Sequence, residues 1–68
     1  MREITETELN KELEGYRPFA YQTAKDVWKS LRDKLTEKDF NECVEYSSNY
    51  FIEQHKEKIT TLYKIRGE

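Results

Sequence analysis

The residue types that most often do chemistry in proteins are sparse in this chain. It has a single cysteine, Cys43, and a single histidine, His55. On one continuous helix these two residues would lie about 18 Å apart along the axis, whereas a zinc site needs four such ligands, or three and a water. The HExxH, P-loop, GxSxG and GxGxxG motifs do not occur. We therefore expect no catalytic residues, no metal site, no cofactor and no small-molecule substrate.

A row of acidic side chains offers the other route to chemistry. Glu42, Glu45 and Glu53 recur at helical spacing, and paired carboxylates can act as a general acid and base. A solvated helix face is the more common reason for such a row. We therefore expect a protein that is not an enzyme.

Aromatic residues make up 13% of the chain, which is more ring surface than so small a core easily buries. Tyr46 and Tyr50 lie one helical turn apart. Tyrosine favours protein interfaces because it combines a large apolar area with a polar tip. The alternative is that these rings cover the edge of the core, with their hydroxyls in water.

A basic strip formed by Lys25, Lys29 and Arg32 recurs at helical spacing and is a candidate for phosphate contacts. The acidic start of the following helix would repel a DNA duplex, so nucleic acid is an alternative partner rather than the favoured one. The net charge of -2 gives no general attraction to nucleic acid or to anionic lipid.

Length and composition indicate one small domain over residues 1–68. One cysteine permits no internal disulfide, so a cytoplasmic location is expected. The first fourteen residues are acidic and lack the apolar run of a signal peptide, and the sequence has no apolar run long enough to span a membrane.

Capping signals and apolar spacing predict an all-α fold, a small three-helix bundle. Thr5 and Glu8 form a capping box that begins a helix over about 6–14, with Gly15 as its C-cap. Pro18 then begins a second helix over about 18–34. Thr36 caps a third over about 37–65, which is long and is either continuous or else bent or broken near residues 47–58. The predicted core comprises Leu9, Leu13, Phe19, Ala24, Val27, Trp28, Leu31, Leu35, Phe40, Val44 and Phe51.

The last helix should extend beyond the other two, and its apolar face changes direction in its second half. We therefore predict that the far end meets another chain, either a different protein or a second copy in a homodimer. The predicted interface comprises Tyr46, Tyr50, Ile52, Ile59, Leu62, Tyr63 and Ile65.

These features favour a non-enzymatic protein–protein interaction module. We expect a small acidic cytosolic regulator or inhibitor of a partner protein, of the kind common in phages and mobile elements. The first alternative is a small DNA-binding transcriptional regulator that uses the basic strip. The second is an acidic mimic of nucleic acid. The residues themselves identify no family.

Overall fold

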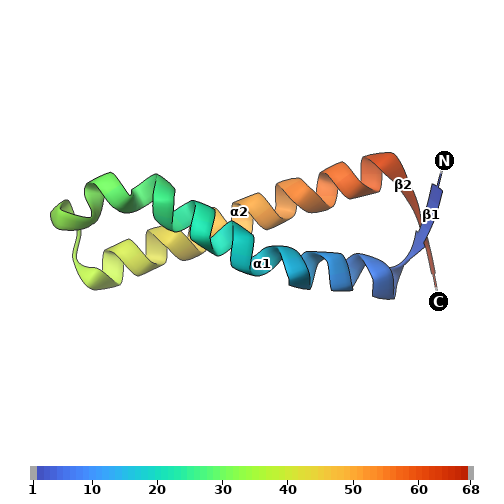
Figure 1. Cartoon of the computed structure of the whole chain (residues 1–68), viewed down its shortest axis with the longest axis horizontal. Helices are drawn as coiled ribbons and strands as arrows, with labels where there is room; N and C mark the ends of the chain where they lie inside the picture. The colour runs from blue at the N-terminus through green and yellow to red at the C-terminus, as the bar shows by residue number, and fades with distance from the viewer. Residues whose placement is uncertain (1, 68) are drawn as a thin grey trace.

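The chain folds back on itself as a helical hairpin whose two ends meet in a short parallel sheet (Figure 1). This computed structural model describes residues 2–67. In chain order the elements are β1 (Arg2–Thr5), α1 (Glu6–Trp28), the 3₁₀ helix η1 (Lys29–Lys34), α2 (Glu37–Leu62) and β2 (Tyr63–Arg66). The hairpin turn lies at one end of an elongated molecule that measures 46 × 17 × 13 Å, and both strands lie at the other.

The predicted three-helix bundle is wrong, because the first two predicted helices are one. The α1 helix begins where the capping box predicts: the Thr5 hydroxyl accepts from the Glu8 amide at 3.1 Å, and the Glu8 carboxylate accepts from the Thr5 amide at 3.1 Å. It then continues through Gly15 and Pro18 without a break. Gly15 does not adopt a positive φ, so it is not the left-handed C-cap that we predicted.

Continuity through Pro18 has a cost, because proline lacks an N–H group and its ring crowds the carbonyl four residues earlier. An interior proline destabilises a helix by about 3 kcal/mol. Burial on both sides of Pro18 offsets this cost, with Leu9 on one side and Ala20 and Ala24 on the other. The course of α1 bends in its middle third, between the blue and the green parts of the ribbon (Figure 1), as an interior proline makes a helix do.

The α2 helix begins as predicted, with the Thr36 hydroxyl accepting from the Asp39 amide at 3.1 Å. It runs unbroken through residues 47–58, so it is the continuous helix that one of our two alternatives described. It ends at Leu62, three residues earlier than predicted, because Tyr63 enters a strand.

The two strands tie the ends of the hairpin together. They are parallel, with Ile4 opposite Ile65 and Arg2 opposite Tyr63. Two four-residue strands have little stability alone. They persist here because the helix ends that adjoin the strands are packed together, with Leu9 of α1 and Ile59 of α2 both buried.

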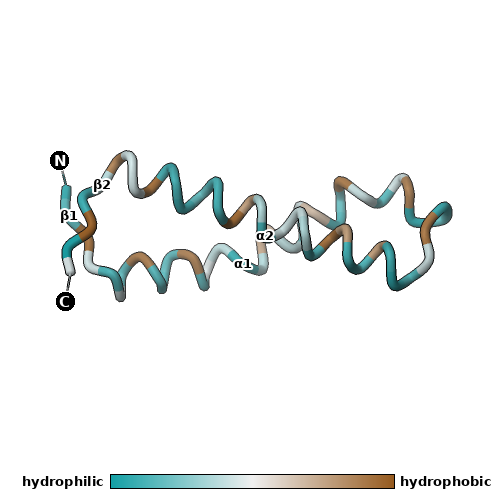
Figure 2. Tube along the Cα trace, turned by 180° about the vertical axis from the view of Figure 1, so that it is seen from behind, coloured by the Kyte–Doolittle hydropathy of each residue, from teal (hydrophilic) through white to brown (hydrophobic). Residues whose placement is uncertain are grey.

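The core is a single narrow seam between α1 and α2. Ala20, Ala24 and Val44 are fully buried, and Phe40 packs against Ala24 and Val44. Apolar residues recur along both helices as bands separated by polar ones (Figure 2). Three residues predicted for the core, Phe19, Val27 and Leu31, are instead exposed. A helix with one helical neighbour buries only a narrow stripe, so the flanks of that stripe remain in solvent.

A substitution at Gly15 tests the continuity of α1. A Cβ added there meets no atom within 4 Å, and alanine favours a helix interior over glycine. Gly15→Ala should therefore raise the free energy of unfolding by about 0.5–1 kcal/mol, measured by urea denaturation. Gly67→Ala, outside the helices, is the control. A loss of about 1 kcal/mol at Gly15 would indicate the left-handed cap of the three-helix alternative.

Candidate functional site

An apolar groove lies near the hairpin turn, between the end of α1 and the first half of α2. Its apolar lining comes from Trp28, Leu35, Cys43 and Tyr46, and the cavity volume is about 640 Å³. Asp39 and Glu42 also line it, so carboxylates border an otherwise apolar hollow.

Local structure fixes the walls of this groove. Asp39, Cys43, Tyr46 and Tyr50 follow one another at spacings of four, three and four, which places them along one face of α2. The Trp28 indole donates from Nε1 to Ser47 Oγ at 2.8 Å, and this bond holds the half-buried ring against α2.

Tyr46 and Tyr50 extend the apolar surface along α2. Their exposed fractions are 77% and 55%. The Tyr50 ring contacts the Phe51 ring edge-on, with 6.0 Å between centroids. We call the set Trp28, Leu35, Cys43, Tyr46 and Tyr50 the aromatic stripe.

The other residues predicted for the interface lie elsewhere. Ile52 and Ile59 are buried in the chain's own core, with exposed fractions of 7% and 8%. Tyr63 and Ile65 belong to β2 and are half-buried, whereas Leu62 is exposed at the end of α2. The predicted surface is therefore divided between the core, the sheet and the stripe, and Tyr46 and Tyr50 are the two of its members that lie together on the stripe.

The basic strip does lie together in the fold. Lys25, Lys29 and Arg32 line a hollow of about 230 Å³ with Asp26 and Phe40. The Arg32 guanidinium lies 4.7 Å from the centre of the Phe40 ring, which is a cation–π contact. Asp26 places a negative charge within the strip, which weakens its attraction for phosphate.

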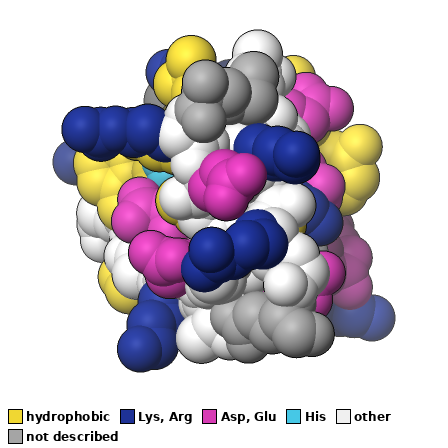
Figure 3. All heavy atoms as spheres, turned by 90° about the vertical axis from the view of Figure 1, so that its right-hand side faces the viewer, with side chains coloured by type: hydrophobic (Ala, Val, Ile, Leu, Met, Phe, Trp, Pro, Cys, Tyr) yellow, Lys and Arg dark blue, Asp and Glu magenta, His cyan; other side chains and the backbone are white. Residues whose placement is uncertain are grey.

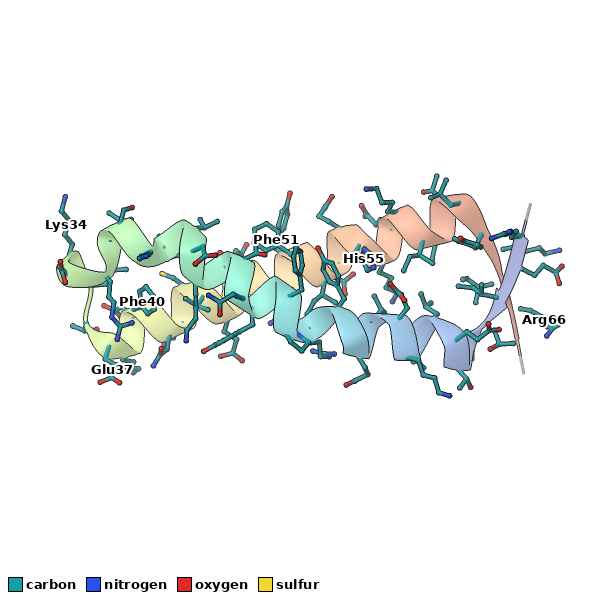
Figure 4. The ribbon with its side chains drawn as sticks, in the orientation of Figure 1. Lys34, Glu37, Phe40, Phe51, His55 and Arg66 are labelled. Carbon is teal, nitrogen blue, oxygen red and sulfur yellow. The ribbon has the colours of Figure 1, made fainter. Side chains whose placement is uncertain are left out.

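A third cluster lies between α1 and α2, on the strand side of the point where the two helices cross (Figure 4). The Tyr16 and His55 rings are stacked, with centroids 3.9 Å apart and planes 8° from parallel. His55 Nε2 lies 3.3 Å from Glu12 Oε1. In Figure 4, His55 points from α2 toward α1. These contacts join the helices on the N-terminal side of Pro18, so their role is structural.

The end of the molecule that carries the strands has a mixed surface. Lys, Arg, Asp and Glu side chains are interspersed there (Figure 3). A hollow of about 590 Å³ beside the strands is lined by Arg2, Glu3, Glu8 and Glu12 together with Ile4, Ile59 and Tyr63. Three carboxylates against one guanidinium leave this hollow net acidic, whereas the surface around it carries charges of both signs.

Within residues 2–67 no three His, Cys, Asp or Glu side chains come together as metal ligands would. The helices of this part of the chain are also too polar for any of them to cross a bilayer. Comparison with known proteins finds no family model, no curated protein and no solved structure that matches the chain. The aromatic stripe is accordingly the candidate site, since it combines Tyr46, the most exposed large apolar side chain of the described residues, with an apolar hollow.

Two neighbouring residues of α2 test the assignment of core and surface. Ile59→Asp buries a charge without a partner and should destabilise the fold by at least about 3 kcal/mol. Leu62→Asp is the matched control: Leu62 is 61% exposed, so its replacement should cost less than about 1 kcal/mol. Thermal unfolding followed by circular dichroism distinguishes them. If the Ile59→Asp chain stayed folded but no longer formed an oligomer, Ile59 would belong to an interface between chains and not to the core.

Proposed function

We propose that the chain is a non-enzymatic protein-interaction module that binds a partner protein through the aromatic stripe. The observation that carries the proposal is the exposure of Tyr46 beside an apolar groove. When a second surface covers exposed rings beside an apolar hollow, apolar area is removed from water, and this burial favours the complex.

The composition of the stripe supports binding to a protein. Tryptophan and tyrosine are enriched among the few residues that dominate interface energies. Trp28 is already held by Ser47, so little side-chain freedom remains for it to lose on binding. The acidic border of Asp39 and Glu42 favours a partner that presents hydrogen-bond donors or positive charge there.

The finer form of the proposal is a small cytosolic regulator or inhibitor, which acts by occupying the partner's surface. A chain of 68 residues with one binding face can block a contact of a larger protein.

DNA binding through the basic strip is the second candidate function, because Lys25, Lys29 and Arg32 converge on one hollow. Asp26 lies in the same hollow, and Asp33 and Glu37 line the next one together with Arg32. These carboxylates oppose a phosphate backbone, so the strip is the weaker of the two surfaces.

Paired variants separate the two functions. Tyr46→Lys with Tyr50→Lys alters the stripe, and Lys25→Glu with Lys29→Glu alters the basic strip; both pairs change exposed or half-exposed positions, so both chains should stay folded. The tagged chain is crosslinked in cells, and the recovered proteins are quantified. Loss of one hot-spot tyrosine costs about 2 kcal/mol, or roughly 30-fold in affinity. The stripe variant should therefore lose a protein that the strip variant retains.

A gel shift with duplex DNA at low and moderate salt completes the test. The proposal requires that the wild type binds DNA only weakly, and that the stripe variant, which carries two added lysines, binds it no more weakly than the wild type does. Tight, salt-sensitive binding that is abolished in the strip variant would overturn the proposal in favour of a DNA-binding regulator.

A further inference from the structure

The exposed side of α2 that borders the groove forms one continuous face. Its members recur with a period of seven residues, so they line up along the helix for about 21 Å. Cys43 is half-buried, and the others are exposed. We call this side the outer face of α2, and it comprises Asp39, Glu42, Cys43, Tyr46, Asn49, Tyr50 and Glu53.

The outer face carries acid at both ends and no base. Asp39 and Glu42 line the groove at one end. Glu53 lies at the other end, eleven residues after Glu42, or about 16 Å further along the axis. Among residues 2–67, none of these three carboxylates has an ion-pair partner. Their negative charge is therefore available to a partner.

These charges oppose a second copy of the chain on this face. An antiparallel two-fold pairing that seats Tyr50 against Cys43 places Glu53 of each copy between Asp39 and Glu42 of the other. A parallel pairing places each of the three carboxylates beside its own equivalent. Like charges that meet in an interface weaken binding, so the occupant of this face must bring the opposite charge.

The surface between the two acidic ends is apolar. It holds the exposed rings of Tyr46 and Tyr50 beside the groove of about 640 Å³. Lysine and arginine suit both parts of this surface, because their cationic heads pair with carboxylates and are attracted to the faces of aromatic rings. One ring of the chain already has such a contact, since Lys25 Nζ lies 5.2 Å from the centre of the Tyr21 ring. The same carboxylates repel phosphate backbones and anionic lipid.

Resting on the proposed function, we infer that the partner presents a basic amphipathic helix that lies along the outer face of α2. Its apolar side chains cover Tyr46 and enter the groove. Its Lys or Arg side chains lie at two sites about eleven residues apart, one facing Asp39 and Glu42 and the other facing Glu53. Eleven residues are close to three helical turns, so both basic sites and the apolar residues between them share one side of the partner helix.

A peptide selection tests the chemistry of this partner. Helical peptides of about 18 residues, long enough to span the face, are displayed on phage with one side randomised and are selected on the full chain. The Tyr46→Ala, Tyr50→Ala double variant in solution removes peptides that do not need the tyrosines. The retained peptides should carry Lys or Arg at both ends, about eleven residues apart, with large apolar residues between them.

Other outcomes of the selection overturn the inference. Retained peptides that are neutral or acidic would do so, but they would leave the proposed function standing because they still need the tyrosines. If no retained peptide needs the tyrosines, the inference is also overturned, and the crosslinking comparison decides the proposed function by itself.

Charge reversal tests the facing pairs, with binding of a selected peptide followed by fluorescence anisotropy. Glu53→Lys should weaken binding by about 10-fold, because it replaces an attraction with a repulsion. A peptide whose facing bases are changed to Glu should recover that loss. Glu45→Lys is the matched control: Glu45 is exposed on α2 but is not part of the outer face, so it should change the affinity by less than about 3-fold. Equal losses for the two variants would overturn the pairing.

The oligomeric state provides an independent check. Light scattering coupled to size exclusion should show a monomer up to about 200 µM, because like charges oppose self-association through the outer face. Circular dichroism should show every variant folded. A wild-type dimer that Tyr50→Ala dissociates would identify a second copy as the occupant and overturn the inference.

Discussion

The close approach of two helices at Ala20 and Ala24 determines much of this molecule. Both alanines are fully buried, and with no larger side chain between the backbones Val44 and Phe40 fill the seam from α2. Because this seam is where the helices bury their apolar residues, each helix uses only one narrow face for the core. The remaining faces stay in solvent, including the face of α2 that carries Tyr46 and Tyr50. The exposure of the aromatic stripe is thus a consequence of building a fold from two helices.

Local capping chemistry made both helix starts predictable, since Thr5 with Glu8 and Thr36 with Asp39 form their bonds within one turn. The course of the chain across Gly15 and Pro18 was not predictable in the same way. Both residues favour a helix end. Here the packing of α1 against the unbroken helix α2 stabilises the helical conformation enough to outweigh that preference. Tertiary packing thus determines that the helix continues across residues 15–18, and such packing cannot be read from a short stretch of sequence.

The strands and the site were partly visible. Tyr63 and Ile65 alternate with Lys64 and Arg66, which is the pattern of a strand, but the spacing of Leu62 and Ile65 fits a helix equally well. Tyr46 and Tyr50 were predicted for the interface, whereas Trp28 and Leu35 were assigned to the core. The spacing of Cys43, Tyr46 and Tyr50 was a signal for a second apolar face on α2. The contribution of Trp28 to that face depends on its bond to Ser47, which no spacing reveals.

The parallel pairing of β1 with β2 also sets how the molecule would bear a load. Arg2 belongs to the residue pair at one end of this ladder and Arg66 to the pair at the other, so tension between them runs along the strands. The backbone hydrogen bonds are then stretched together in shear, rather than being opened one after another as in a hairpin pulled from its open end. A sheet of only four residue pairs therefore acts as a mechanical clasp, and the helices behind it remain shielded from tension until that clasp ruptures.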